Sequence, residues 1–349
     1  MKLFKAILCL CLIIGLLVSF AACSGGNEPR VAEYFTFFDT VTCVYSYAGD
    51  TREDFEKRCD GVTEILGEYH RFFDIYHEYS GINNLRTLNL NAGNQAVTLD
   101  EKLIDFLLYA KEMYYTTDGK MNIMMGSVLS LWHDCREQAE KDKSGARIPS
   151  KQELDDASAY TDMSFLEIDP ENNTAFITNP KASIDVGALG KGYAAERAAD
   201  YLKSVGAEAY VLDVGGNLRI VGHKPDGSGW VTGIKDPRSI GSFALRLTLA
   251  DVSCVTSGSY ERFYTVDGKD YHHIIDRDTL MPAEYFDSVT VICEDSGLAD
   301  ALSTALFCMS YEQGLALAQN IGDVEVFWIK SDGTQYMTDG LSDLIKESD

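Results

Sequence analysis

The chain has 349 residues, 46% of them hydrophobic, which is enough for one large domain or two small ones with a sizeable core. Its 54 acidic residues outnumber 30 basic ones, and the net charge of −24 argues against binding to nucleic acid or broad contact with anionic lipid. No low-complexity block, internal repeat or linker rich in Pro, Gly and Ser divides the sequence, so we expect one folded unit.

The N-terminus has the pattern of an export signal. Lys2 and Lys5 precede an apolar run over residues 6–20, which is too short for a comfortable membrane span. The small residues before Cys23 resemble the lipobox of bacterial lipoproteins, in which that cysteine is lipidated, although Phe20 stands where Leu is usual. An ordinary cleaved signal peptide is the alternative interpretation.

We favour the lipoprotein, because the residues after the cysteine suit a flexible tether. The expected organisation is a signal peptide over 1–22, the lipidated Cys23 with its tether over 23–32, and one domain over 33–349. Such a protein would be held by its lipid on the extracytoplasmic face of the cell membrane. The cysteines of the domain show no C-x-x-C spacing, so we expect no zinc site, and their pairing cannot be derived from the sequence.

Helices and strands are both predicted in the first half of the domain. Residues 33–49 are rich in aromatic and β-branched residues and predict a strand. Residues 51–76 have helical spacing behind Thr51 as the cap, and residues 98–120 predict a second helix. Residues 136–157 are polar and predict a surface excursion.

The second half alternates in the same way. A hairpin is predicted around Pro170–Asn173, a third strand arrives at Ile184, and a helix over 192–207 ends at Gly206. Residues 296–322 predict a helical hairpin or a bent helix. Further strands are predicted over 209–223, 229–236, 243–258, 287–295 and 324–330. The predicted fold class is therefore α+β (mixed α/β), a single domain of mixed sheets flanked by helices.

A glycine-rich helix start raises the first functional question. The segment that leads into the helix contains Gly187, Gly190, Lys191 and Gly192. A helix start offers unpaired N–H groups and a partial positive charge, glycine lets a ligand approach the backbone, and the lysine adds a full charge. Together these suit a phosphate. The spacing is neither G-x-G-x-x-G nor a P-loop, and a glycine turn that packs a helix on a sheet explains it equally well.

Residues 257–282 hold a dense group of polar and ionisable side chains. The two histidines, His272 and His273, lie on a predicted strand, where neighbours face opposite ways, so at most one points into a given pocket. A lone histidine is more often structural than catalytic, but this pair has a tyrosine and an aspartate close by. The glycine pair in 213–222 is more simply a bulge or a close backbone crossing.

Asp300 and Thr304 are four residues apart in an Ala- and Leu-rich helix, and therefore lie on one face. A carboxylate and a hydroxyl placed in this way suit a hard cation such as Mg²⁺. Asp300 lies too deep in the apolar pattern for a comfortable helix cap, which favours the metal.

Taken in order, these segments resemble the ApbE family of flavin transferases (FAD:protein FMN transferases) over nearly the whole mature chain. The strongest matches are "DVGALGKGYAAE", "VLDVGGNLRIVG", "SGSYER", "HHIID" and "ADALSTALF". Each is weak alone, whereas the ordered set is specific. The resemblance implies FAD as substrate, Mg²⁺ as cofactor, AMP as a product, and an exported protein that accepts FMN on a Ser or Thr hydroxyl.

The resemblance also implies roles for single residues. It makes His273, or Asp276 behind it, the base that takes the hydroxyl proton. Asp300, Thr304 and the backbone carbonyl of Ala188 correspond to the metal ligands. The positions that correspond to FAD contacts are Phe38, Tyr76, Lys120, Met121, Asn122, Asp185, Lys191, Ser257 and Ile275.

Five positions depart from the pattern of the family. Phe38 stands in place of a methionine, Met121 in place of an aromatic residue, and Asn122 in place of an aspartate. In "IIDRDTLMP", Arg277 and Leu280 replace a proline and a glycine. These last two leave the local turn and the acceptor specificity open.

Three rival functions also remain open. The same site with water in place of the acceptor would hydrolyse FAD to FMN and AMP. A solute-binding lipoprotein or a flavin carrier without chemistry would need no metal ligands and leaves Asp300 unexplained. A redox flavoprotein would keep its FAD and would be yellow when purified.

Overall fold

The structure is a computed structural model that describes residues 29–47, 49–239 and 241–346. The predicted signal peptide, Cys23 and the first part of the tether lie outside the described residues. None of the described helices combines the length and the hydrophobicity that a membrane crossing needs.

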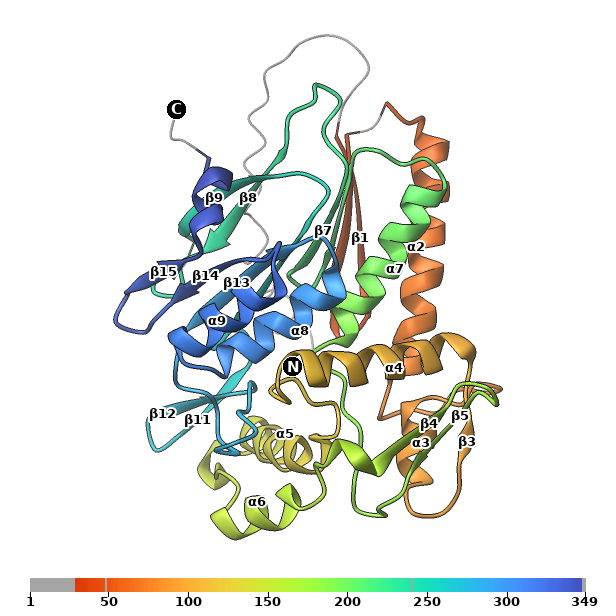
Figure 1. Ribbon diagram of the computed structural model, residues 1–349, viewed down its shortest axis with the longest axis vertical. Helices are drawn as coiled ribbons and strands as arrows, with labels where there is room; N and C mark the ends of the chain where they lie inside the picture. The colour runs from red at the N-terminus through yellow and green to blue at the C-terminus, as the bar shows by residue number, and fades with distance from the viewer. Residues whose placement is uncertain (1–28, 48, 240, 347–349) are drawn as a thin grey trace.

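A large sheet forms the centre of the fold (Figure 1), and every neighbouring pair of its strands is antiparallel. In spatial order its eight strands are β1 (Arg30–Phe37), β2 (Thr40–Ser46), β6 (Tyr210–Val214), β7 (Asn217–Val221), β10 (Ser253–Gly258), β13 (Ser288–Cys293), β14 (Glu325–Ile329) and β15 (Gln335–Met337). The sheet confirms the predicted mixture of strands and helices.

Two short turns correct the sequence predictions. The chain reverses at Phe38 and Asp39, with φ of 52° and 53°, so the single strand predicted over 33–49 is wrong and the segment is the β1–β2 hairpin. The glycine pair is not a bulge either: Gly215 and Gly216, with φ of 61° and 90°, turn β6 into β7. Two-residue turns with positive φ match the twist of paired strands.

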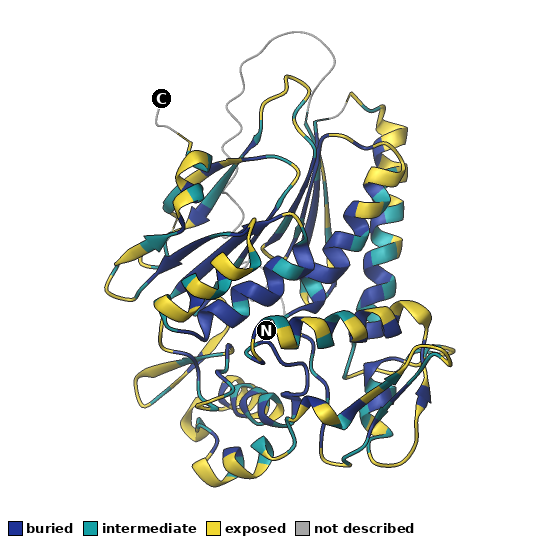
Figure 2. Ribbon diagram, in the orientation of Figure 1, coloured by how far each residue is buried: buried dark blue, intermediate teal, exposed yellow. Residues whose placement is uncertain are grey.

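Both faces of the large sheet are covered, because side chains alternate along each strand. In β14, Trp328 packs into the core on the helix side, whereas its neighbour Phe327 packs into a second core. The helices that pack on the sheet in the first core are α2 (Arg52–Phe73), α7 (Gly190–Ser204), α8 (Ser296–Phe307) and α9 (Tyr311–Ile321), and two further helices at one end add to it. A two-stranded sheet supplies the second: β8 (Trp230–Lys235) and β9 (Phe243–Leu249). Figure 2 shows the buried stripes of the helices turned toward the sheet.

The rest of the chain packs at one end of these layers (Figure 1). It contains α3 (Leu85–Leu90), α4 (Glu101–Thr116), α5 (Gly126–Lys141), α6 (Lys151–Ser158), a sheet of β3 (Val97–Thr98), β5 (Thr174–Ile177) and β4 (Leu166–Asp169), and the hairpin of β11 (Phe263–Val266) and β12 (Lys269–His272). The excursion predicted over 136–157 is the end of α5 with α6. No strand forms at Ile184, where a single bridge joins Met125 to Ser183.

Most α-helix starts follow the expected capping chemistry, with two exceptions among the described helices. The hydroxyl of Thr51 accepts the N–H of Asp54 at 3.1 Å and caps α2, as predicted. The carboxylate of Asp295 accepts the N–H of Leu298 at 2.7 Å and caps α8, so Asp300 is not that helix's cap. The exceptions are α5 and α7, whose own cap residues, Met125 and Leu189, make no side-chain cap.

Candidate functional site

A cavity of 1020 Å³ brings the predicted site residues together. Its volume is at the upper end of the roughly 300–1,000 Å³ that small-molecule pockets occupy. The β1–β2 turn, the segments before α5 and α7, the chain after β12, and α8 all contribute to its walls. The predicted residues that line it are Phe38, Tyr76, Lys120, Met121, Asn122, Asp185, Ala188, Lys191, Ser257, His273, Ile275, Asp300 and Thr304.

A second cavity, of 690 Å³, contains none of these residues. It lies at the far end of α7, beside Gly206. Four of its charged side chains pair with one another: Arg58 bonds to Asp50, and Lys203 lies 3.5 Å from Asp251. The first cavity gathers the predicted residues and is therefore the candidate site.

The start of α7 meets α8 at the candidate site. The backbone N–H of Gly192 donates to Oδ2 of Asp300 at 2.8 Å, so the carboxylate replaces the missing cap of α7. A Cβ on Gly192 would lie 2.2 Å from the carbonyl oxygen of Ser296, which means that only glycine allows the two helices this close. The glycine-rich segment therefore has both of the features that its sequence suggested. It packs two helices closely, and it forms a helix start with a charged residue at a cavity.

Two carboxyl groups lie at this helix start, of which that of Asp300 is buried and that of Asp185 is partly buried. Burial raises the pKa of Asp300, while the charge of Lys191 and the bond from Gly192 oppose that rise. Burial also raises the pKa of Asp185, whose Oδ1 accepts the N–H of Gly187 at 2.9 Å. The region therefore contains acids that lack full solvation beside a lysine, an arrangement common at functional sites.

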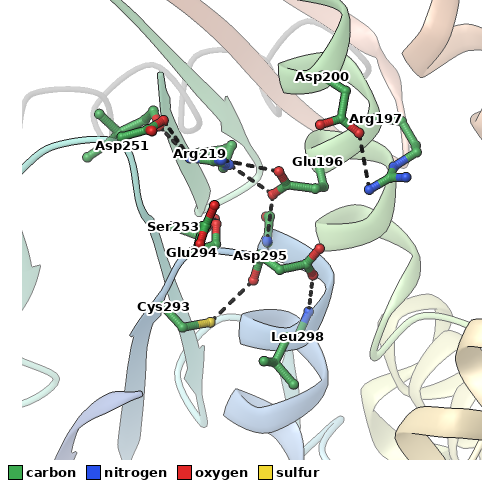
Figure 3. A network of polar contacts seen from close by, with 12 residues as sticks. Glu196, Arg197, Asp200, Arg219, Asp251, Ser253, Cys293, Glu294, Asp295 and Leu298 are labelled. Carbon is green, nitrogen blue, oxygen red and sulfur yellow. Dashed lines mark hydrogen bonds and ion pairs between the residues drawn. The ribbon is translucent and has the colours of Figure 1, made fainter. Parts of the chain in front are cut away.

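A buried ion pair fixes the position of α8 relative to α7 (Figure 3). Arg219 of β7 is fully buried, and its Nε donates to Oε2 of Glu196 on α7 at 2.8 Å. The same carboxylate oxygen accepts the N–H of Ser296, the first residue of α8, at 2.7 Å. The pair thus joins the sheet to both helices one turn before Asp300, and holds that carboxylate at the cavity.

The residues present fit the predicted Mg²⁺ ligands by donor type. Within the described ranges, no group of three or more His, Cys, Asp or Glu side chains could hold a metal ion. The predicted ligands are instead one carboxylate, of Asp300, with the hydroxyl of Thr304 and the carbonyl of Ala188, all on the cavity wall. Mg²⁺ accepts such a sparse oxygen set, because it usually keeps waters and binds substrate phosphates as well.

The two histidines differ in how their ring nitrogens are used. His272 accepts the N–H of Ile274 through Nδ1 at 3.2 Å and its Nε2 lies 2.9 Å from the carbonyl of Ala283, so both nitrogens are occupied. His273 uses only Nδ1, which lies 3.1 Å from the carbonyl of Arg262. A carbonyl only accepts, so Nδ1 carries the hydrogen and Nε2 keeps its lone pair.

His273 is neutral at pH 7, because burial and the charge of Arg262 lower its pKa to about 3. Its side chain is nevertheless open to the cavity. A neutral imidazole with a free nitrogen on the wall of a cavity can act as a general base. The sequence favoured His273, and the geometry separates it from His272.

Asp276 is placed differently from the other predicted residues. It is buried and does not line the cavity, and its Oδ1 accepts from Nζ of Lys120 at 3.0 Å. Burial alone would lower the pKa of Lys120, but its bonds to Asp278 and Asp276 raise it. The carbonyl of Arg262, rather than the carboxylate of Asp276, therefore contacts the ring of His273.

Two of the departures have structural roles. Asn122 is 8% exposed and organises the loop before α5, since its amide donates to the carbonyl of Thr161 and its carbonyl accepts the N–H of Met124, both at 2.9 Å. Met121 is 1% exposed and packs into the main core. An aspartate and an aromatic residue are thus replaced by side chains that fit this loop.

Two pairs of aromatic side chains line the cavity, and the sequence predicted only one member of each pair. The N–H of Phe38 donates to Nδ1 of His70 at 3.2 Å, and the two rings meet edge to face at 5.7 Å. The ring of Tyr76 lies 5.4 Å from that of His133 on α5. His70 and His133 were not predicted, because each lies alone in a helical stretch and only the fold brings it to the cavity.

The sequence is similar to those of known proteins. The model of the ApbE family matches residues 40–328. An "FAD:protein FMN transferase" of Treponema pallidum (strain Nichols) is 28% identical over 356 residues, which cover 96% of each chain. A protein of the same name from Klebsiella pneumoniae (strain 342) is 29% identical over 265 residues, 74% of this chain and 78% of its own length.

Solved structures have the same fold. The crystal structure of the ApbE protein of Thermotoga maritima has a TM-score of 0.81 at 26% identity, over 92% of this chain and all of the other. The apo form of the Pseudomonas stutzeri flavinyl transferase ApbE has a TM-score of 0.76 at 25% identity, over 92% of this chain and 98% of its own.

Proposed function

The chain belongs to the ApbE family, and we propose that it acts as an FAD:protein FMN transferase whose reaction takes place in the 1020 Å³ cavity. Relatives that align with most of the chain carry that name, and the protein is an enzyme of the transferase class with FAD as substrate. The observation that carries the proposal is the meeting in one cavity of a helix start with Lys191, the pair Asp300 and Thr304, and a histidine with a free nitrogen.

The pyrophosphate of FAD binds at the start of α7. Lys191 lines the cavity there, and a helix start favours anions through its unpaired N–H groups and its dipole. Asp300, Thr304 and the backbone carbonyl of Ala188 would hold Mg²⁺, which would neutralise charge on the pyrophosphate and on the AMP leaving group.

His273 serves as the base of the transfer. Its Nε2 takes the proton from a Ser or Thr hydroxyl of the acceptor protein. The oxygen of that hydroxyl forms a bond to the FMN phosphorus, and the bond from this phosphorus to the bridging oxygen breaks. AMP leaves with the electron pair of that bond. The product is an acceptor protein joined to FMN by a phosphoester, and no nucleophile of this chain is needed.

The location follows from the N-terminal sequence. We infer that Cys23 carries a lipid and that the enzyme acts on the extracytoplasmic face of the membrane, on exported acceptors. Covalent attachment suits an exported redox protein, since a loosely bound flavin would diffuse away. Labelling of the cells with a radioactive fatty acid, with Cys23→Ala as the control, tests the anchor independently of the activity.

One experiment separates the proposed function from its rivals. The mature protein is mixed with FAD, Mg²⁺ and an acceptor domain, and the acceptor is weighed by mass spectrometry, with and without EDTA. We expect the acceptor to gain one FMN unit only when the metal is present. Free FMN and AMP without a gain in mass would show a hydrolase. Intact FAD bound to the protein would show a carrier or a redox flavoprotein, and would refute the transferase.

A further inference from the structure

The segment that follows the histidines closes into a small loop over residues 276–281. The N–H of Asp276 donates to the carbonyl of Met281 at 2.9 Å, and the N–H of Leu280 donates back to the carbonyl of Asp276 at 2.7 Å. Leu280 adopts a φ of 59°, a conformation that favours glycine, and Nε1 of Trp132 on α5 donates to its carbonyl at 3.0 Å. The loop therefore exists despite the loss of the proline and the glycine of the family.

Three side-chain bonds fasten this loop to the chain that follows α4. Nζ of Lys120 donates to Asp276 at 3.0 Å and to Asp278 at 2.8 Å. Nη1 of Arg277 donates to the carbonyl of Gly119 at 3.0 Å. Gly119 has a φ of 75°, and a Cβ there would lie 1.9 Å from Nη1 of Arg277, so glycine is required for this contact.

The fastening lies next to residues that line the cavity. The side chain of Asp276 is 2% exposed and that of Lys120 is 13% exposed, so their ion pair is largely shielded from water. Lys120 and Ile275, the neighbour of Asp276, both line the cavity. His273 lies two residues before Ile275. A shift of the loop would therefore move the proposed base relative to the rest of the cavity.

We propose that Lys120 and Asp276 are a pair of positioning residues, in which Asp276 acts through Lys120 to hold the His273 segment and takes no part in proton transfer. This inference rests on the proposed function, because it assigns a role to the chain that holds the proposed base. Asp276 is then not the general base, a role for which the resemblance made it the alternative to His273. It also moves Lys120 from a contact with FAD to a contact with the protein.

The geometry supports this assignment against the alternative. Both ring nitrogens of His273 are accounted for without Asp276, since Nδ1 faces the carbonyl of Arg262 and Nε2 is the free one. The charged groups that act on His273 are Arg262 and Lys191, with His272 beside it. Asp276 is not among them, and its Oδ1 is taken by Lys120 and by the N–H of Asp278 at 3.1 Å.

The test is a double-mutant cycle on the mature enzyme with Asp276→Asn, Lys120→Met and both together. AMP release from FAD is measured against pH, and FAD binding is measured by flavin fluorescence. We expect each single variant to lower kcat/KM by roughly 10- to 100-fold, the range in which a misplaced reacting group costs rate. The kcat/KM of the double variant should be no lower than that of the less active single variant. The shape of the pH profile should not change.

Controls separate positioning from a general loss of structure. Lys102→Met and Glu68→Gln make the same kinds of change in an exposed ion pair away from the cavity, and should keep the wild-type rate. Lys120→Arg keeps the charge and should recover most of the activity. A loss of the ionisation that sets the pH profile in Asp276→Asn alone, or additive effects in the double variant, would overturn the proposal.

The failure of this inference is distinct from the failure of the proposed function. A wild-type enzyme that neither releases AMP nor modifies an acceptor refutes the function. The coupling between Lys120 and Asp276 is then read from FAD binding alone, where the same non-additive loss is expected. Additive losses of FAD affinity would refute the pair whether or not the wild type is active.

Discussion

The carboxylate of Asp300 on α8 accepts the backbone N–H of Gly192 at 2.8 Å, so that a side chain of one helix caps the start of another. The two residues are far apart in sequence, and α7 has no side-chain cap of its own. One carboxylate therefore has two tasks, as the cap of α7 and as the proposed ligand of Mg²⁺. Changes at this contact are expected to affect stability and activity in different ways.

Asp300→Asn should separate these two tasks. Asparagine keeps an oxygen that can accept the N–H of Gly192 but loses the charge that the metal requires. We expect kcat to fall by about 10²- to 10³-fold, the usual loss when one electrostatic group is removed from a reaction site. AMP release at saturating FAD across a Mg²⁺ titration measures this. Asp323→Asn, an exposed change, is the control.

The same variant should not be less stable than the wild type at pH 7. Burial raises the pKa of Asp300 in the folded protein above its value in the unfolded chain. At pH 7 the ionised carboxylate therefore lowers the free energy of unfolding. Asparagine removes this cost. Thermal unfolding at pH 7 measures it, and a markedly lower Tm for Asp300→Asn would contradict it.

Gly192→Ala should destabilise the fold. The added Cβ would lie 2.2 Å from the carbonyl oxygen of Ser296 and 2.4 Å from Cβ of Asp300, and the helix backbone cannot yield easily. We expect a loss of about 1–3 kcal/mol in the free energy of unfolding. Gly314→Ala is the control, because the atom nearest to its added Cβ would be the flexible Cδ2 of Leu306, at 3.3 Å.

Denaturant unfolding of both variants makes the comparison. Gly314 lies inside α9, where alanine is favoured over glycine by up to about 1 kcal/mol. The control should therefore be as stable as the wild type or slightly more stable. Equal losses in the two variants would mean that the close approach of α7 and α8 does not depend on Gly192.

The pH dependence should reflect the lowered pKa of His273. Because the surrounding protein and Arg262 lower this pKa below its ordinary value of about 6.5, the base stays neutral as the pH falls through that value. We expect kcat/KM to show no ionisation near pH 6.5, and His273→Gln to lower it by about 10²- to 10⁴-fold. An acid limb near pH 6.5 that disappears in this variant would contradict the geometry.

His273 also affects stability in acid. Because the pKa of His273 is lower in the folded than in the unfolded state, the unfolded state binds more protons below about pH 6.5, and the fold loses stability as the pH falls below that value. His273→Gln should lose less stability than the wild type over this window. Thermal unfolding at several pH values measures the difference, and parallel curves would refute it.

The buried pair of Glu196 and Arg219 should show strong coupling (Figure 3). Removing one partner leaves a buried charge uncompensated, which typically costs about 3–5 kcal/mol. We expect Arg219→Met to destabilise the protein by that order, and Glu196→Gln with Arg219→Met to cost less than the sum of the two single changes. Urea unfolding of the four proteins measures the coupling, and additive values would deny it.

Short-range chemistry was read correctly from the sequence. Thr51 was predicted as a cap because its hydroxyl reaches an N–H only a few residues away. Asp300 and Thr304 were placed on one face because the helix repeat fixes their relation, and both line the cavity. The β1–β2 turn was missed because Phe38 and Asp39 hold positive φ without the glycine that normally signals it.

The sequence by itself determined the fold class, the family resemblance and a set of candidate residues, most of which line the cavity, because each depends on local periodicity or on ordered motifs. Only the tertiary structure decided which nitrogen of His273 is free, that Asp276 pairs with Lys120, and that Asp300 caps α7. These contacts join residues far apart in the chain. Such pairing depends on how helices and loops pack in space, and local spacing carries no information about it.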